Sequence, residues 1–383
     1  MDKRLFLALL LTAFVVVLTP VIFPPPRPSS PVSDTTAASS RAAAGRAEVT
    51  PDVRTQPGQS TPGGRAAEPV TGAQRRVAAD TARAVAPVVA ETTVVGAGGS
   101  TYRFINPGAA PVSVVLDDYR SLRPGGRGSV DLVRSGDQLL RYRFVIGADT
   151  IALDTIPMRA SVASSTGGAS AVTFTSGPLA LTTPGVTPTA TLTYTIPAGG
   201  DAHLTVVEGR VAGVPPGRAA LLVDLPRTLR TEEADTLEDI RHLSYAFKRG
   251  NEEVQSTSFG KLDTGTVRAE GGPLAWVAAR NKYFLTALIG VGNESPFAGV
   301  LLAGVPHPQR ALPREGRATV VVPLRDGTFR FQVYAGPQKY TRLHALGRDL
   351  ENVNPYGGWM HGFVQPFSTI VMRILLWLKR TTA

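Results

Sequence analysis

The sequence predicts an all-β fold, one large antiparallel β-sandwich with an apolar helix before it and an amphipathic helix after it. Three observations support this prediction. Apolar and polar residues alternate along several short segments, Gly- and Pro-rich turns separate those segments, and an apolar run lies near each terminus. Regularly spaced short strands of this kind are typical of two packed antiparallel sheets.

The composition excludes several classes of function. The 383 residues carry 40 Lys+Arg against 30 Asp+Glu, a net charge of +10, and no cysteine. The arginines are scattered and form no basic stripe interleaved with aromatic residues, so no nucleic-acid partner is expected. An Arg-biased surface explains the charge and is compatible with anionic lipid head groups. The absence of cysteine excludes disulfides, thiol catalysis and thiolate metal sites.

Residues 1–23 are predicted to be a cytoplasmic tip and a transmembrane anchor. Lys3 and Arg4 precede an uncharged run, Leu5–Phe23, whose 19 residues would span about 28 Å as a helix, close to the ~30 Å of a hydrocarbon core. The positive-inside rule keeps the N-terminus in the cytoplasm and sends the main domain to the periplasmic side of the inner membrane. A cleaved signal peptide is the alternative, but the run ends in prolines without an A-x-A-like site.

Residues 24–90 are predicted to form a disordered tether. Pro, Ser, Thr, Ala, Gly and Arg dominate, and no Phe, Tyr or Trp occurs between Pro24 and Glu91. Such a segment cannot bury enough apolar surface to offset the entropy lost on ordering. We expect a spacer, with an unstructured binding arm as the alternative.

The sandwich is predicted over residues 91–353. Leu140–Ile146, Ala190–Ile196 and Phe329–Val333 alternate between apolar and polar residues, which indicates strands with one buried face. Further short β-rich runs lie between turn clusters, at Tyr102–Ile105, Val112–Leu116, Ala171–Thr175, His203–Val207, Tyr283–Ile289 and Ala318–Leu324. Two helical pieces are expected at Glu232–Ile240 and Gln338–Leu350, the second covering the sandwich near its exit.

No catalytic, cofactor-binding or metal-ligating residue is predicted. The five histidines are scattered without metal-ligand spacing, and the chain has no H-E-x-x-H, G-x-S-x-G, P-loop or G-x-G-x-x-G motif. Glu232-Glu233 and Glu252-Glu253 are consecutive, and neighbouring residues on a strand point to opposite faces. We therefore expect both pairs in solvated loops rather than in a two-carboxylate glycosidase site.

Residues 354–383 are predicted to form an amphipathic helix in the membrane interface. Apolar residues recur at helical spacing, bracketed by two tryptophans, while polar residues lie mostly elsewhere. A second spanning helix and a helix packed on the sandwich are the alternatives. The side chains expected at the interface are Trp359, Phe363, Phe367, Ile370, Ile374 and Trp377.

The order of anchor, tether, sandwich and amphipathic helix resembles the N-terminal region of the YidC-type membrane protein insertases of Gram-negative bacteria. Four segments carry the resemblance: Met1–Pro20, Gly271–Ile289, Phe331–Tyr340 and Tyr356–Leu378. In the third, Gln338 stands where the family usually has Lys. The motif residues within these segments are Trp276, Tyr283, Phe284, Gly336, Pro337 and Gly358.

The resemblance implies a periplasmic β-supersandwich similar to galactose-mutarotase-like sandwiches. It implies that the full protein is a chaperone and insertase for inner-membrane proteins, with the lipid bilayer, Sec translocon components and nascent membrane proteins as partners, and without enzymatic activity or cofactor. The family's insertase core of five further spanning helices does not occur before Ala383. We therefore expect a fragment or a truncated reading frame that does not insert proteins by itself.

Two alternatives remain open at this point. A membrane-tethered carbohydrate-binding or mutarotase-like domain predicts a cleft in which histidines and carboxylates converge. An envelope scaffold without a ligand is distinguishable only by its interactions. Fold class alone does not decide between them.

Overall fold

A computed structural model describes residues 91–354, except 98, 165–167, 183–186, 200–202, 215–216 and 309–311, together with residue 371. The predicted anchor, the tether and nearly all of the C-terminal segment lie outside these residues. Among the helices that are described, none is both long enough and apolar enough to cross a bilayer.

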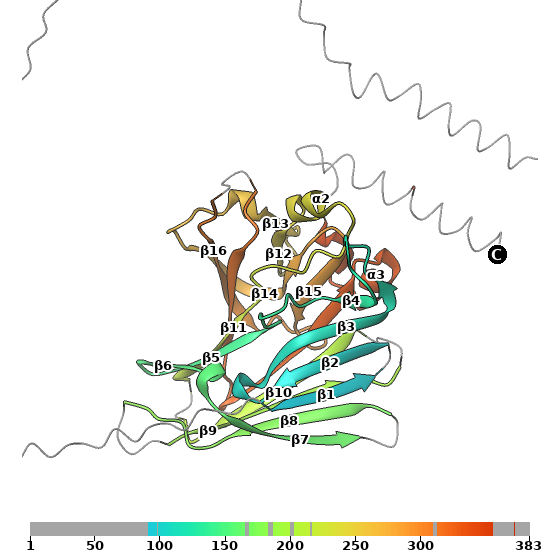
Figure 1. The fold of residues 1–383 in the computed structure, drawn as a ribbon. Helices are drawn as coiled ribbons and strands as arrows, with labels where there is room; N and C mark the ends of the chain where they lie inside the picture. Colours follow the sequence, from blue (N-terminus) through green and yellow to red (C-terminus); the bar gives the residue numbers. More distant parts are fainter. Residues whose placement is uncertain are drawn as a thin grey trace, which may run out of the picture. The chain divides into compact units, whose positions relative to one another are not determined.

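Two antiparallel sheets form the domain, as the alternating segments predicted (Figure 1). The smaller sheet has the order β1-β2-β3-β4, with β1 (Thr92–Ala97), β2 (Ser100–Ile105), β3 (Ala110–Arg120) and β4 (Ser129–Asp131). The larger has 14 strands and runs β6-β5-β11-β17-β16-β14-β15-β18-β10-β9-β8-β7, with β12 paired to β14 and β13 paired to β12.

The strands of the larger sheet are β5 (Arg141–Ile146), β6 (Asp149–Ala152), β7 (Met158–Ser164), β8 (Ser170–Ser176), β9 (Thr189–Ile196), β10 (Leu204–Ala212), β11 (Ala219–Asp224), β12 (Ser244–Arg249), β13 (Gln255–Ser258), β14 (Arg268–Arg280), β15 (Phe284–Ile289), β16 (Phe297–Gly304), β17 (Gly316–Pro323) and β18 (Thr328–Pro337). The helical segments are η1 (Pro107–Ala109), η2 (Leu153–Thr155), α2 (Thr236–Arg241), η3 (Phe259–Lys261), α3 (Tyr340–Leu346) and η4 (Leu350–Val353).

The main core lies between the two sheets. Phe104 of β2 contacts Tyr194 of β9 and Phe174 of β8, with ring centroids 4.7 and 5.7 Å apart. The Tyr194 hydroxyl also donates to the backbone carbonyl of Ala109 at 2.7 Å, so a buried polar group is satisfied. Buried residues alternate with partly exposed ones along β5 and β9, which confirms the period-two prediction for both strands.

Strands β14 and β15 are buried on both faces, and this explains why their sequences do not alternate. The last seven residues of β14 and all six of β15 are buried. One face contributes to the main core. The other packs beneath α3 and η4, where Trp276, Leu285 and Tyr334 contact Leu343 and Leu350 in a second apolar cluster. A strand covered on both faces has no solvent-exposed face, so its sequence need not alternate between apolar and polar residues.

Both predicted helices are shorter than expected. The first begins at Thr236 rather than Glu232, because the Asp235 side chain caps it by accepting the Glu238 N–H at 3.0 Å. The second ends at Leu346, because Gly347, Arg348 and Asp349 all have positive φ. Leu350, predicted on the same helix, lies instead in η4.

The prediction of solvated glutamates holds for one pair and is wrong for Glu232 of the other. Glu252 and Glu253 are exposed. Glu232, however, is 2% exposed, and its carboxylate lies 3.0 Å from the Arg230 guanidinium. A buried carboxylate needs a counter-charge, and Arg230, two residues away, supplies it.

Candidate functional site

Five of the six predicted family-motif residues lie on β14, on β18 and around the start of β15, near the last residues of the described range 91–354. Phe284 pairs with Pro337 and Leu285 with Gly336, where β15 lies beside β18. Tyr283 lies in the turn before β15 and is 44% exposed. We call the β14–β15 turn, the end of β18, α3 and η4 the exit end (Figure 1). Gly358 and all six predicted membrane-interface residues lie outside the described residues.

Trp276 fixes the segment that follows α3. It lies on β14, is fully buried, and its Nε1–H donates to the Arg348 carbonyl at 2.9 Å. The Arg348 guanidinium reaches back to the carbonyls of Ala275, at 3.3 Å, and Glu294, at 2.6 Å. One indole and one guanidinium thus join strand β14, the β15–β16 loop and the segment that follows α3.

An ion pair holds the next residue of the same segment. The Lys248 ammonium on β12 lies 2.5 Å from the Asp349 carboxylate, and the Lys248 side chain is almost fully buried. Arg348 and Asp349 have φ of 59° and 56°, in the left-handed region that non-glycine residues rarely adopt. Side-chain contacts from Trp276 and Lys248 therefore stabilise a backbone conformation that local preference disfavours.

Asn281 organises the turn between β14 and β15. Its Oδ1 accepts the N–H groups of Tyr283 and Phe284, at 3.1 and 2.8 Å, and its Nδ2 donates to the Asp239 carboxylate at 3.2 Å. The other Asp239 oxygen accepts the Lys282 N–H at 3.1 Å. Burial raises the pKa of Asp239 to about 6, and the hydrogen bond from Lys282 opposes this rise.

Gln338 performs a role that its position in the motif did not reveal. Its Nε2 donates to the carbonyls of Asn281 and Phe284, at 2.7 and 3.1 Å, and its own N–H donates to the Tyr283 carbonyl at 2.7 Å. These three hydrogen bonds attach the start of α3 to the β14–β15 turn. A side-chain donor is needed here, and an amide provides it without a charge.

Gly336 is required by the packing of His203. A Cβ built at position 336 would lie 2.8 Å from the Cβ and Cγ of His203. The imidazole is buried, its Nδ1 lies 2.8 Å from the Ser100 Oγ, and it contacts the rings of Tyr119 and Tyr334 edge-on. Burial, with the nearby Arg342 charge, lowers the pKa of His203 to about 4, and Asp118 opposes this shift. His203 is therefore neutral at pH 7.

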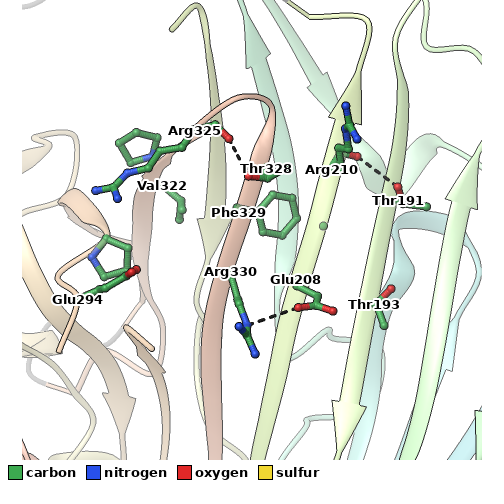
Figure 2. Close-up of a pocket in the computed structure, with 13 residues that line it drawn as sticks. Thr191, Thr193, Glu208, Arg210, Glu294, Val322, Arg325, Thr328, Phe329 and Arg330 are labelled. Atoms are coloured by element: carbon green, nitrogen blue, oxygen red, sulfur yellow. Dashed lines mark hydrogen bonds and ion pairs between the residues drawn. The ribbon is translucent and has the colours of Figure 1, made fainter. Parts of the chain in front are cut away.

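A second candidate site is an open cleft on the outer face of the larger sheet (Figure 2). Its volume is about 700 Å³, and β9, β10 and β18 supply most of its lining. Figure 2 shows the Glu208 and Arg330 side chains pointing toward each other, with 3.4 Å between carboxylate and guanidinium. Arg210, Arg325 and Glu294 also line it, so three arginines and two glutamates contribute to its surface.

The cleft's lining bears on the carbohydrate-active alternative. Its described side chains include threonines, arginines and glutamates but no histidine, so the expected convergence of histidine and carboxylate is not seen among them. Across the described ranges, no three His, Cys, Asp or Glu side chains gather where they could hold a metal ion. The arrangement is suited to hydrogen bonding with a polar ligand.

The family model described as the YidC periplasmic domain matches residues 104–370. The chain belongs to the YidC family. Curated relatives named membrane protein insertase YidC include one from Prosthecochloris aestuarii, 35% identical over 123 residues, in a match that covers 29% of this chain and 20% of the relative. Another, from Chlorobaculum parvum, is 30% identical over 116 residues, 29% of this chain and 19% of the relative. The matched part of the chain thus spans about a fifth of these relatives' length.

Solved structures similar to this YidC-family chain include a galactose mutarotase-like protein from Lactobacillus casei. It is 13% identical, with a TM-score of 0.42, and the match covers 64% of this chain and all of that one. A putative aldose 1-epimerase from Escherichia coli is 7% identical, with a TM-score of 0.40, 65% of this chain and 99% of that one being covered. At these scores the likeness carries no conclusion, and the all-β assignment depends on the observed strands.

Proposed function

We propose that this YidC-family chain is the anchor and periplasmic region of a membrane protein insertase. It acts at the inner membrane with its N-terminus in the cytoplasm and assists insertion and folding of membrane proteins, alone or beside the Sec translocon. The match of the YidC periplasmic domain over residues 104–370 is the observation that carries this proposal. The exit end supports it, because family-motif residues pack there: Trp276 donates to the Arg348 carbonyl, and Phe284 pairs with Pro337.

Site-specific cross-linking in a Gram-negative cell tests the proposed partners. The chain has no cysteine, so a single one at exposed Tyr283 or exposed Val162 gives a matched pair of probes on different parts of the surface. We expect cross-links to nascent membrane proteins or Sec components in the membrane fraction. A chain recovered only in the soluble periplasm, or cross-links no different from those of an unrelated tethered domain, would contradict the proposal.

We propose polar ligand binding, with carbohydrate as the class to test first, as a second function. The observation that favours it is the cleft in which Glu208, Arg210 and Arg330 lie on neighbouring strands. A glycan-binding screen with the full chain, compared with Arg330→Ala, tests it. Binding lost in the variant is the expected result, and equal signal from both proteins, or none from either, would exclude the cleft as a carbohydrate site.

A further inference from the structure

Two exposed apolar side chains lie on segments that are joined by contacts, the β3–β4 loop and the exit end. Leu122, in the loop between β3 and β4, is 60% exposed, and Tyr283 is 44% exposed. The rings of Tyr119 and Phe284, their near neighbours in sequence, are 5.9 Å apart. The Leu122 N–H donates to the Glu232 carbonyl at 2.8 Å, in the segment leading to α2, whose Asp239 accepts the Lys282 N–H.

The loop that carries Leu122 is built to hold it outward. The Ser121 N–H donates to the Gly128 carbonyl at 3.1 Å and closes the base of the loop, and the Gly126 N–H donates to the Arg123 carbonyl at 2.7 Å. Gly125 and Gly128 have positive φ, which glycine adopts without strain. The leucine is therefore presented by a defined turn.

Basic side chains surround both apolar residues. Arg123 and Arg127 flank Leu122 in the loop, Lys282 lies 5.3 Å over the Tyr283 ring, and exposed Lys339 begins the α3 turn that is bonded to Tyr283. In the part of the chain that the structure describes, no carboxylate lies within ion-pair distance of these four cations.

Nearby acids limit where the positive charge is strongest. Asp235 and Glu238 of the α2 region interact with Lys282, and Glu238 is also 3.3 Å from Arg241. These acids weaken the attraction of Lys282 for an anionic surface, so the charge test uses Arg123 and Arg127. We call the six residues Leu122, Arg123, Arg127, Lys282, Tyr283 and Lys339 the exit-end surface.

We propose that the exit-end surface docks on anionic phospholipid head groups, with Leu122 and Tyr283 entering the interface and the four cations contacting phosphates. Exposed apolar residues ringed by Lys and Arg fit such a boundary, where tyrosine is enriched. The chain's course agrees with this. Asn354, the last residue described before the apolar stripe of the C-terminal sequence, lines the same small pocket as Lys282 and Tyr283.

The test uses the full chain in nanodiscs of phosphatidylcholine, with or without about one-third phosphatidylglycerol. An environment-sensitive fluorophore is placed on Leu122→Cys or Tyr283→Cys, and on Val162→Cys as a control, because Val162 is 55% exposed on the edge strand β7. We expect a blue shift and protection from a water-soluble quencher at positions 122 and 283 in anionic nanodiscs, and neither at position 162.

Charge variants separate docking from simple tethering. Each Lys or Arg near an anionic surface contributes about fivefold to binding, so Arg123→Glu with Arg127→Glu should lower the docked-to-undocked ratio at least about twentyfold. The proposal would be overturned if the labels at 122 and 283 were as accessible as the label at 162, or if protection were equal in both lipids. Protection in detergent without lipid would also overturn it, because contact with a second copy of the chain would give that result. It rests on the proposed membrane attachment: a chain lost from the nanodiscs overturns both, whereas incorporation with exposed labels overturns docking alone.

Discussion

His203 should make the stability of the exit end depend on pH, with a sign that the structure fixes. Burial among Tyr119, Tyr334 and Gly336 lowers its folded pKa to about 4, below the ordinary 6.5. Below pH 6.5 the unfolded chain binds a proton that the folded chain does not. The contribution of neutral His203 to the free energy of unfolding is therefore complete above pH 6.5 and is lost as pH falls toward 4.

The magnitude follows from the width of that window. At about 1.4 kcal/mol per pKa unit, a shift from 6.5 to about 4 corresponds to about 3 kcal/mol. Asp239 works in the opposite direction. Its pKa is raised from 3.8 to about 6. Burial of its charged form therefore destabilises the folded protein fully above pH 6, and this destabilisation disappears as pH falls below 4. The two groups largely cancel in the wild-type protein, and single substitutions should separate them.

Urea unfolding from pH 7 to pH 4, followed by tryptophan fluorescence, measures the difference between wild type and His203→Asn. Asparagine retains a partner for Ser100 but does not titrate. Whatever the cost of the substitution at pH 7, the variant should gain about 3 kcal/mol relative to wild type by pH 4. A difference between the two proteins that does not change with pH over this range would refute the reasoning, and Asp239→Asn should show the opposite trend.

Gly336→Ala should destabilise the protein by about 1–3 kcal/mol in urea unfolding, because the new Cβ would clash with the His203 side chain. Gly271→Ala is the control: its new Cβ has no neighbouring atom within 4 Å, so it should change stability by less than about 1 kcal/mol. Gln338→Ala should cost about 1–3 kcal/mol, because two hydrogen bonds are lost, and Gln338→Lys should restore most of it; equal values for the two variants would contradict this role. Trp276→Phe should cost about 2–4 kcal/mol of stability and increase hydrogen exchange in residues 347–353. Unchanged exchange there would show that the indole does not stabilise residues 347–353.

The alternation of apolar and polar residues was sufficient to predict a strand where one face of that strand is exposed to solvent. Phe144 on β5 and Tyr194 on β9 are buried between partly exposed neighbours, as their alternation predicted. The pattern failed for β14, which was noted only as a motif around Trp276, because both of its faces are covered. Glu232 was misplaced for a related reason: its burial depends on the Arg230 charge and on how the segment folds, which spacing along the chain does not encode.

The sequence by itself determined the all-β class, nine of the 18 described strands and the family resemblance, because alternation and turn residues act over a few neighbouring positions. The tertiary structure decided why the motif residues matter. Gly336 meets His203, 133 positions away in the chain, and Trp276 meets Arg348, separated by 72. Contacts across such separations exist only once the sheets have assembled, so the exit end and its neighbouring basic, apolar surface could be recognised only in the folded domain.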